Sequence, residues 1–193
     1  MNILSVDQNI LIWLNGFLVG KNPALDFVVK FLAAYLIYAL PIVLIILWFV
    51  YPNKRKALFM SVLGGALAWF VITKSIVPHI WFRARPDLAI LGAKEILFHR
   101  PDYSFPSDHA TMLFGLTFGL YVFGWKKAGN WFLVFAILIT LCRVAVGVHF
   151  PLDVIGGAIS GLIGVGIVRV FEKFISKVIF DPLVTLLRKV RLA

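Results

Sequence analysis

The sequence has few charged residues and almost no cysteine. Only 15% of its 193 residues are charged, whereas 61% are hydrophobic; soluble domains carry charge at about a quarter of their positions. This deficit excludes an ordinary water-soluble globule. Cys142 is the single cysteine, which excludes an internal disulfide framework and a zinc site built from several cysteines.

The charge that is present is unbalanced. The chain carries 19 Lys and Arg against 9 Asp and Glu, a net charge of +10. Long apolar runs separate these bases, unlike the dense basic patches of nucleic-acid-binding proteins. We therefore expect no nucleic-acid partner, and the positive balance instead indicates contact with membrane lipids.

Five apolar segments are long enough to span a bilayer. A spanning helix needs about 20 mostly apolar residues, because lipid cannot hydrogen-bond an exposed backbone. The segments cover residues 31–53, 57–82, 108–125, 128–148 and 153 to just beyond 169. In the last span, a stripe of small residues predicts close helix packing. The stripe consists of Gly157, Gly161, Gly164 and Gly166.

Residues 3–20 are apolar but contain Asp7, Gln8 and Asn15. We interpret them as an interfacial helix, and a sixth span is the competing interpretation. A cleaved signal peptide is less favoured, because no basic cluster precedes the segment. The predicted fold class is thus all-α: an integral membrane helical bundle with five or six transmembrane helices, forming one domain over residues 1–193.

The charges on alternate sides of the predicted spans indicate an orientation. One side receives eleven Lys and Arg but two Asp and Glu, and the other side eight bases and seven acids. Because loops rich in Lys and Arg stay in the cytoplasm, the first side is predicted to lie inside. The loop 83–107 and the turn around His149 then lie on the extracytoplasmic face of the cell (plasma or inner) membrane.

Polar side chains that are costly near a membrane form three clusters. They follow the second span, open the third, and straddle the turn between the fourth and fifth. Alternation of five helices places all three clusters on the outer face. The clusters are Arg83, Arg85, Pro86 and Asp87; Ser104, Pro106, Ser107, Asp108 and His109; and Arg143, His149 and Asp153.

Such a combination of groups suits a phosphoryl group. Arg guanidinium groups bind phosphate oxygens in paired contacts, while one His attacks phosphorus and another protonates the departing oxygen. A helix beginning near Ser107 adds N-terminal amides, which favour anions. If the fourth helix frays near Gly147, Arg143 and His149 face one cavity, and Asp153 can hold a His149 ring nitrogen. The pattern predicts phosphoryl transfer to water.

Three strings carry a family resemblance: RARPD (83–87), SFPSDHA (104–110) and CRVAVGVHFPLDVIGG (142–157). They resemble the signature motifs of the type-2 phosphatidic acid phosphatase superfamily of membrane lipid phosphatases. The PSDH form of the second string and the opening pattern DQNILIWLNG…NPALD are most similar to bacterial undecaprenyl-pyrophosphate phosphatases of the bacitracin-resistance type.

The resemblance implies a role for each matching residue. His149 would be the nucleophile that becomes a phosphohistidine, Asp153 its orienting partner, and His109 the acid that protonates the leaving group. No metal or other cofactor is implied. The groups that would bind the phosphate oxygens are Arg85, Ser107, Arg143 and the backbone amide of Asp108.

The chain departs from the family pattern at two positions. The first motif commonly has Lys seven residues before Arg85, where this sequence has Pro78; the nearest upstream lysine, Lys74, would lie roughly 16 Å from Arg85 along a continuous helix. Either Arg83 fills the cationic role, or Pro78 bends the helix and brings Lys74 closer. Cys142 stands where the third motif usually has Ser.

The resemblance implies a lipid phosphate or pyrophosphate as the substrate. Hydrolysis of a polyprenyl pyrophosphate to the monophosphate, which recycles the carrier lipid of cell-wall synthesis, is the preferred expectation. The same chemistry could act on phosphatidylglycerophosphate, phosphatidic acid or lipid A. A membrane anion transporter is the alternative from a different class, although its bases should lie at several depths.

Overall fold

The computed structural model describes residues 2–98 and 102–189. Within these ranges the chain is helical, apart from one isolated β-bridge between Ala84 and Tyr103. The predicted all-α fold is therefore confirmed. Arg191, which contributes to the predicted charge asymmetry, lies outside the described residues.

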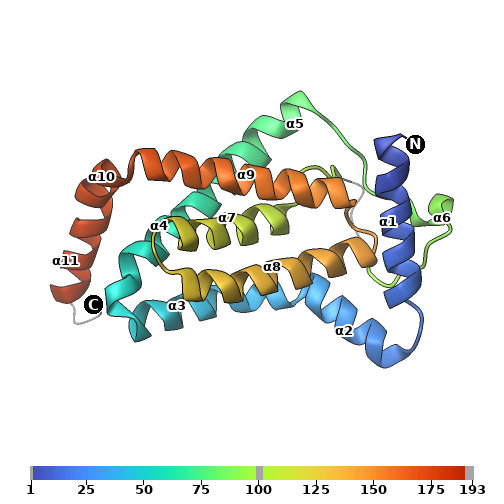
Figure 1. The fold of residues 1–193 in the computed structure, drawn as a ribbon, viewed down its shortest axis with the longest axis horizontal. Coiled ribbons are helices and arrows are strands. Elements are labelled where there is room, and N and C mark those ends of the chain that lie inside the picture. Colours follow the sequence, from blue (N-terminus) through green and yellow to red (C-terminus); the bar gives the residue numbers. More distant parts are fainter. Residues whose placement is uncertain (1, 99–101, 190–193) are drawn as a thin grey trace.

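Four helices lie side by side and form the body of the bundle (Figure 1). They are α4 (Arg55–Leu67), α7 (Asp108–Val122), α8 (Lys126–Ala145) and α9 (Pro151–Val170). Helix α7 packs against the other three. The approach of α7 to α9 is so close that a Cβ atom on Gly161 would lie 2.6 Å from the backbone nitrogen of Gly115. The predicted glycine stripe thus packs closely at three of its positions, whereas a Cβ atom added to Gly166 would meet no described atom within 4 Å beyond the neighbouring backbone of its own helix.

Three helical segments of the described chain are long and apolar enough to cross a membrane: Pro52–Ile80, Lys126–Ala145 and Pro151–Val170. The second predicted span corresponds to the first of these, which continues α4 through a π-helical stretch, Ala68–Ile76, into α5 (Val77–Ile80). The predicted third span coincides with α7, whose 15 residues are too few for it to count among these segments by length.

The first predicted span, 31–53, differs from the observed structure. Helix α2 (Pro23–Ala34) begins earlier, and a bend of 50° separates it from the segment Leu36–Val50, which ends in α3 (Leu40–Val50). Pro41 lies in the first turn of α3, where its missing backbone N–H breaks no helical hydrogen bond. If the bent pair counts as one span, the described residues contain up to four spans by length and composition.

Helix α1 (Ile3–Leu18) runs across one end of the bundle instead of along it (Figure 1). Its buried face carries Asp7, Leu11 and Asn15. The Asn15 side chain donates to the carbonyls of Ala145, at 2.9 Å, and Lys94, at 2.8 Å. This placement fits an interfacial helix, and it brings α1 to the end of the bundle where the three polar clusters lie.

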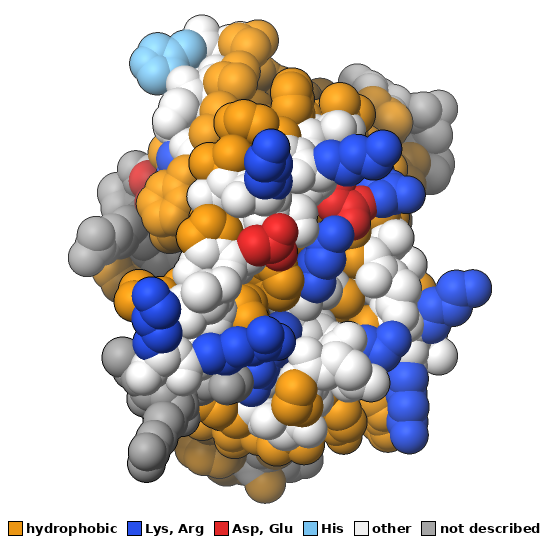
Figure 2. All heavy atoms as spheres, turned by 90° about the vertical axis from the view of Figure 1, so that its left-hand side faces the viewer, with side chains coloured by type: hydrophobic (Ala, Val, Ile, Leu, Met, Phe, Trp, Pro, Cys, Tyr) orange, Lys and Arg blue, Asp and Glu red, His pale blue; other side chains and the backbone are white. Residues whose placement is uncertain are grey.

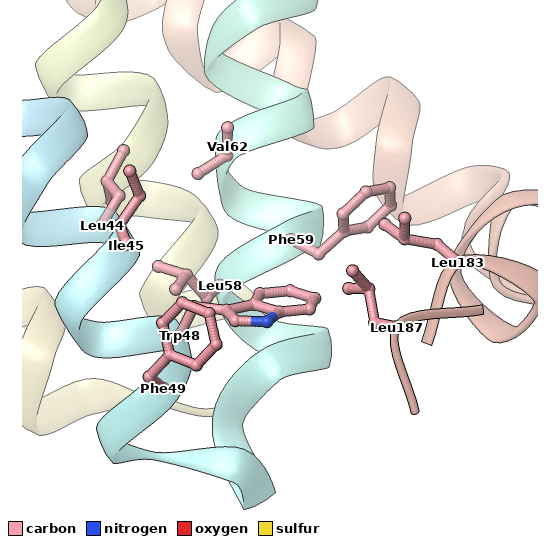
Figure 3. A pocket seen from close by; sticks show the side chains of 9 residues that line it. All are labelled: Leu44, Ile45, Trp48, Phe49, Leu58, Phe59, Val62, Leu183 and Leu187. Atoms are coloured by element: carbon pink, nitrogen blue, oxygen red, sulfur yellow. The ribbon is translucent and has the colours of Figure 1, made fainter. Parts of the chain in front are cut away.

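The opposite end of the bundle is capped by α10 (Glu172–Ile175), a π-helical stretch (Ser176–Phe180) and α11 (Asp181–Lys189), which turn away from the axis of α9 (Figure 1). An apolar cavity of about 310 Å³ lies between α3, α4 and α11 (Figure 3). Its walls are Leu44, Ile45, Trp48, Phe49, Leu58, Phe59, Val62, Leu183 and Leu187.

Candidate active site

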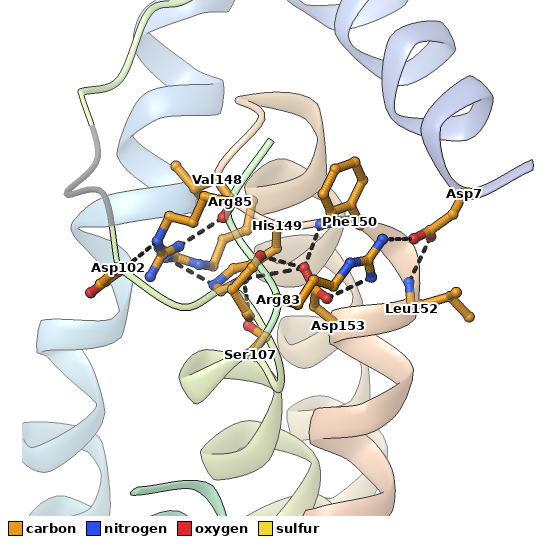
Figure 4. Close-up of polar contacts among 12 residues, drawn as sticks. Asp7, Arg83, Arg85, Asp102, Ser107, Val148, His149, Phe150, Leu152 and Asp153 are labelled. Atoms are coloured by element: carbon orange, nitrogen blue, oxygen red, sulfur yellow. Dashed lines mark hydrogen bonds and ion pairs between the residues drawn. The ribbon is translucent and has the colours of Figure 1, made fainter. Parts of the chain in front are cut away.

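The three polar clusters meet at the end of the bundle that α1 crosses (Figure 4). After α5 the chain is extended, and the carbonyl of Arg83 accepts a hydrogen bond from the amide of Ser104 at 2.7 Å. The amide of Ser107, the residue that precedes α7, donates to the carbonyl of Asp153 at 3.0 Å. These backbone contacts bring segments that are far apart in sequence to one place, as the alternation of helices predicted.

The turn between α8 and α9 places His149 beside the end of α8. Gly147 has a φ of +75°, a left-handed conformation that L side chains rarely adopt, and a Cβ atom there would lie 2.3 Å from a methyl carbon of Leu88. Pro151 then starts α9 with a preset φ. The chain therefore reverses sharply between Arg143 and α9.

Two imidazoles flank one guanidinium group. The terminal nitrogens of Arg143 lie 3.4 Å from Nε2 of His109 and 3.4 Å from Nε2 of His149. Arg143 also donates to the carbonyl of Ala33 at 2.8 Å, which ties it to α2. Both histidines thus direct a ring nitrogen toward the same cation.

His149 is held by a backbone carbonyl. Its Nδ1 lies 2.9 Å from the oxygen of Ser104, and since a carbonyl only accepts, Nδ1 carries the hydrogen. Nε2 is then the unprotonated nitrogen that faces Arg143. Burial, together with the charges of Arg143 and Arg85, lowers the pKa of His149 to about 4, although the nearby carboxylate of Asp153 acts in the opposite direction. The ring is neutral at neutral pH, as a nucleophile requires.

The predicted direct contact between Asp153 and His149 is not a hydrogen bond. Asp153 Oδ2 lies 3.8 Å from Nδ1 of His149, beyond hydrogen-bonding distance. The same oxygen accepts instead from Ser104 Oγ, at 2.5 Å, and from the amide of Phe150, at 2.7 Å. Asp153 is therefore connected to the imidazole through Ser104, a residue to which the sequence assigned no individual role although it lies in the second motif.

Several polar groups around Arg143 are buried without a hydrogen-bond partner. Within the described residues, Ser107 Oγ, Arg143 Nε and one carboxylate oxygen of Asp108 have none. Buried polar groups nearly always find a partner. The Ser107 hydroxyl and the Arg143 N–H are donors that phosphate oxygens would satisfy, beside the N-terminus of α7.

Arg85 lies in the same region, as predicted. Its guanidinium donates to the carbonyl of Val148 at 2.7 Å and to Asp102 at 2.5 Å (Figure 4). The sequence alone does not indicate Asp102 as a site residue, because it lies in a polar loop where a carboxylate is usually solvated.

The two candidate cations of the first motif occupy different places. Arg83 directs both terminal nitrogens to carboxylates, Asp7 and Asp153. It is therefore not available to bind phosphate oxygens, which was one of the two predicted alternatives. Lys74 Nζ lies 2.6 Å from Asp108 and 3.0 Å from Tyr103. The distance of 16 Å assumed a helix that continues to Arg85, whereas the helix ends at Ile80. Lys74 thus reaches the wall of the site through Asp108.

A cavity of about 660 Å³ opens beside these groups. One wall is charged and the other is apolar and aromatic, which suits a molecule with a phosphate head and a hydrocarbon tail. His149 is buried and is not part of the lining, while Arg143 is. The charged wall consists of Arg85, Asp102, Asp108, His109 and Arg143, and the other wall includes Ala34, Ile37, Tyr38, Leu40, Trp69, Leu97 and Phe98.

Paired imidazoles and guanidinium groups at one end of an apolar helical bundle define a multi-pass membrane phosphatase. The chain belongs to the PAP2 superfamily, whose profile matches residues 58–176. It is 28% identical to the undecaprenyl-diphosphatase BcrC of Bacillus subtilis (strain 168) over 178 residues, 83% of this chain and 90% of that protein. The bacitracin transport permease protein BcrC of Bacillus licheniformis is 33% identical over 148 residues, 75% of this chain and 71% of the relative.

The fold is also that of a solved structure. LpxE of Aquifex aeolicus aligns with a TM-score of 0.63 and 28% sequence identity, over 84% of this chain and 93% of that one. Residues 58–176, which match the family model, contain all three motif strings. The sequence resemblance to this superfamily is therefore confirmed.

Proposed function

We propose that the protein hydrolyses a polyprenyl pyrophosphate, undecaprenyl pyrophosphate, to the monophosphate and inorganic phosphate. This reaction would return the carrier lipid to cell-wall synthesis. The observation that carries the proposal is the position of Arg143, with terminal nitrogens 3.4 Å from Nε2 of both His109 and His149. A phosphoryl group bound by this guanidinium has a nucleophile on one side and a proton donor on the other.

The proposed reaction has two steps. Nε2 of His149 attacks the terminal phosphorus in line, the bond to the bridging oxygen breaks, and His109 gives a proton to the departing monophosphate. Water then attacks the phosphohistidine, His109 takes a proton from that water, and phosphate leaves. Arg85, Arg143 and the Ser107 hydroxyl would stabilise the charge on the equatorial oxygens.

The cavity and the relatives support a polyprenyl substrate. The apolar wall formed by α2, α3 and the 88–98 loop can hold a hydrocarbon chain next to the charged wall. The relative from Bacillus subtilis is named for action on undecaprenyl diphosphate and is matched over most of its length. A substrate panel that compares this lipid with phosphatidylglycerophosphate, phosphatidic acid and lipid A tests the choice; at least tenfold higher kcat/KM on a glycerolipid would overturn it.

We propose that the catalytic end faces the extracytoplasmic side of the cell membrane. Lys and Arg side chains gather on the opposite end of the bundle, over α10, α11 and the neighbouring helix ends (Figure 2). Loops rich in these residues remain in the cytoplasm. The described basic residues at this end are Lys54, Arg55, Lys56, Lys126, Lys127, Arg169, Lys173, Lys177, Arg188 and Lys189.

The activity is tested by release of inorganic phosphate from undecaprenyl pyrophosphate in detergent micelles. His149→Asn and His109→Asn should each lower kcat by at least a factor of about 100, the usual scale of an acid, base or nucleophile. His79→Asn is the matched control, because His79 is exposed and contacts the backbone of Ser75. Unchanged turnover in both site variants would reject this chemistry.

The Bacillus licheniformis relative is named as a bacitracin transport permease protein, which favours membrane transport as a second candidate. In the described chain, however, the charged groups that line the cavity lie at one end of the bundle. Phosphate uptake into proteoliposomes that persists in His149→Ala would support transport, whereas loss of both phosphate release and any uptake would support hydrolysis.

A further inference from the structure

Asp7 is a buried carboxylate on α1 that lies outside the three motif strings and outside residues 58–176, which match the family model; it opens the pattern DQNILIWLNG, where the sequence assigned it no role. Its side chain is 1% exposed. One carboxylate oxygen accepts from the backbone amide of Leu152 at 2.8 Å, and the other accepts from the guanidinium of Arg83 (Figure 4). An anion is costly to bury unless it is paired, so this position needs a reason beyond packing.

Arg83 connects Asp7 to the group that orients the nucleophile. Its second terminal nitrogen donates to Asp153 at 2.8 Å, and its guanidinium lies 4.1 Å from the centre of the Phe150 ring. Asp153 in turn accepts from Ser104 Oγ. The backbone of Arg83 adds a second connection, because its carbonyl accepts from the amide of Ser104, whose own carbonyl accepts from His149.

Two carboxylates therefore share one guanidinium. While Asp7 holds one side of the fork, Arg83 can donate only one terminal nitrogen to Asp153. Asp153 Oδ2 then remains free to accept from Ser104 and from the amide of Phe150. Without the charge of Asp7, the guanidinium would lose a partner inside the protein and would be drawn to Asp153 alone, which would shift the Ser104 contact and the His149 ring.

We propose that Asp7 is a positioning residue for His149 and acts through Arg83 and Asp153. The inference rests on the proposed phosphatase chemistry. It gives α1 a role in the reaction: this helix fixes the guanidinium that sets the geometry of the Asp153–Ser104–His149 chain. Within the described residues the polar partners of Asp7 are Arg83 and Leu152, neither of which lines the cavity, so the loss of its charge should affect the rate of phosphoryl transfer and not substrate binding.

The main test is Asp7→Asn, which keeps the size and the acceptor for Leu152 but removes the charge. We expect kcat for phosphate release from undecaprenyl pyrophosphate to fall about tenfold, as a misplaced reacting group does, with KM within about twofold of the wild type. Asp7→Glu keeps the charge and should retain most of the activity. A wild-type kcat in Asp7→Asn would overturn the inference.

Asn15→Ala is the matched control for loss of helix docking. Asn15 is buried on the same face of α1 and bonds Lys94 and Ala145, but it does not contact Arg83. We expect its kcat to remain within about twofold of the wild type. If Asn15→Ala loses as much activity as Asp7→Asn, the effect belongs to the docking of α1 and the inference fails.

A double-mutant cycle identifies the route of the effect. If Asp7 acts through Arg83, Asp7→Asn in an Arg83→Gln background should cause no further loss of activity. Losses that multiply would contradict this route.

If Asp7→Asn does not accumulate in membranes, Arg83→Lys provides the test, because one ammonium group cannot bind both carboxylates with the geometry of the fork. This variant should have a lower kcat and an unchanged KM, and a wild-type kcat would overturn the inference. A wild type that releases no phosphate from any lipid would reject the proposed function itself.

Discussion

His149 presents one defined ring nitrogen to the cavity side because the other is already bound. The carbonyl of Ser104 takes the Nδ1 hydrogen, and Arg143 faces Nε2. A backbone carbonyl cannot take up or release a proton at neutral pH, so this choice of tautomer does not depend on pH. The carboxylate of Asp153 adds a favourable charge nearby without sharing the proton.

The buried position of His149 predicts an unusual titration. Its pKa is lowered to about 4, whereas an unfolded histidine titrates near 6.5. In NMR of ¹⁵N-histidine-labelled protein, the ring signal that disappears in His149→Asn should stay that of a neutral imidazole as the pH falls through 6. A ring assigned to His149 that titrates near 6.5 would contradict the burial of this group.

The same shift has a consequence for stability. The unfolded chain takes up a proton near pH 6.5 and the folded protein only near 4, so the folded state loses stability as the pH falls through this window. The free energy of unfolding should therefore decrease between pH 6.5 and 4, and decrease less steeply in His149→Asn. Equal slopes for the two proteins in thermal unfolding at several pH values would refute this expectation.

Ser104 should contribute to rate through its hydroxyl. Ser104→Ala keeps the carbonyl that bonds His149 but removes the donor to Asp153. We expect kcat to fall by a factor of about 10, with little change in KM, because Oδ2 of the buried Asp153 carboxylate loses the hydrogen bond from Ser104 Oγ. Steady-state kinetics with Ser75→Ala as the control, a serine whose hydroxyl bonds the carbonyl of Phe70 outside the site, checks this prediction.

At the scale of helices, the site depends on how closely α7 and α9 approach. A Cβ atom on Gly161 would lie 2.6 Å from Gly115 N and 2.9 Å from the carbonyl oxygen of Thr111. Both atoms belong to backbone, which cannot move aside like the end of a side chain. The two helices carry His109 and Asp153 near their N-terminal ends, so their spacing also fixes the distance between these two residues.

Gly161→Ala should therefore destabilise the protein by about 1–3 kcal/mol, the usual cost of overpacking. Gly166→Ala is the matched control on the same helix, because the added Cβ would meet no described atom within 4 Å beyond the neighbouring backbone of that helix, and it should be neutral or raise stability by up to about 1 kcal/mol. Thermal unfolding in detergent, followed by tryptophan fluorescence, measures both. A Gly161→Ala protein as stable as the wild type would show that the helices separate without cost.

Much of this architecture could be predicted from the sequence, and the exceptions have physical reasons. Hydropathy and alternation of the helices predicted that Arg85, His109 and His149 lie at one end, because membrane helices leave few alternatives. At the bend between α2 and α3, Leu36, Ile37 and Leu40 pack against a cluster of α7 and α8 residues, a contact that hydropathy does not describe. The cluster consists of Leu113, Ala136 and Ile139.

The partners of individual side chains could not be predicted in the same way. Arg83 and Arg85 are two residues apart in an extended segment, where a regular strand would place both on one face. Arg83 nevertheless bonds Asp7 and Asp153, whereas Arg85 bonds Asp102 and Val148, so the alternation of side chains does not predict which arginine lines the cavity. The role of Asp7 depends on the docking of α1, which no local pattern in residues 3–20 reveals.

At the scale of the whole molecule, the basic surface and the candidate active site lie at opposite ends of the bundle. The basic end carries α10 and α11, and the other end carries the site and α1 (Figures 1 and 2). This separation predicts which parts of the protein a membrane-impermeant reagent can reach from each side.

Cysteine labelling tests that orientation. In a Cys142→Ser background, Lys94→Cys should react with an impermeant maleimide added to intact cells, and Lys127→Cys should react only after the cells are opened. Both lysines are exposed, so burial does not limit the reaction. The reverse pattern would invert the topology and place the site in the cytoplasm.

The position of α1 also affects how the protein should be handled in the laboratory. The chain ahead of Ile3 leaves the fold beside the catalytic end, whereas α11 leaves it at the far end (Figure 1). An affinity tag or fluorescent reporter fused at the start would pull on the helix that holds Arg83, while the same fusion at the end would leave turnover intact.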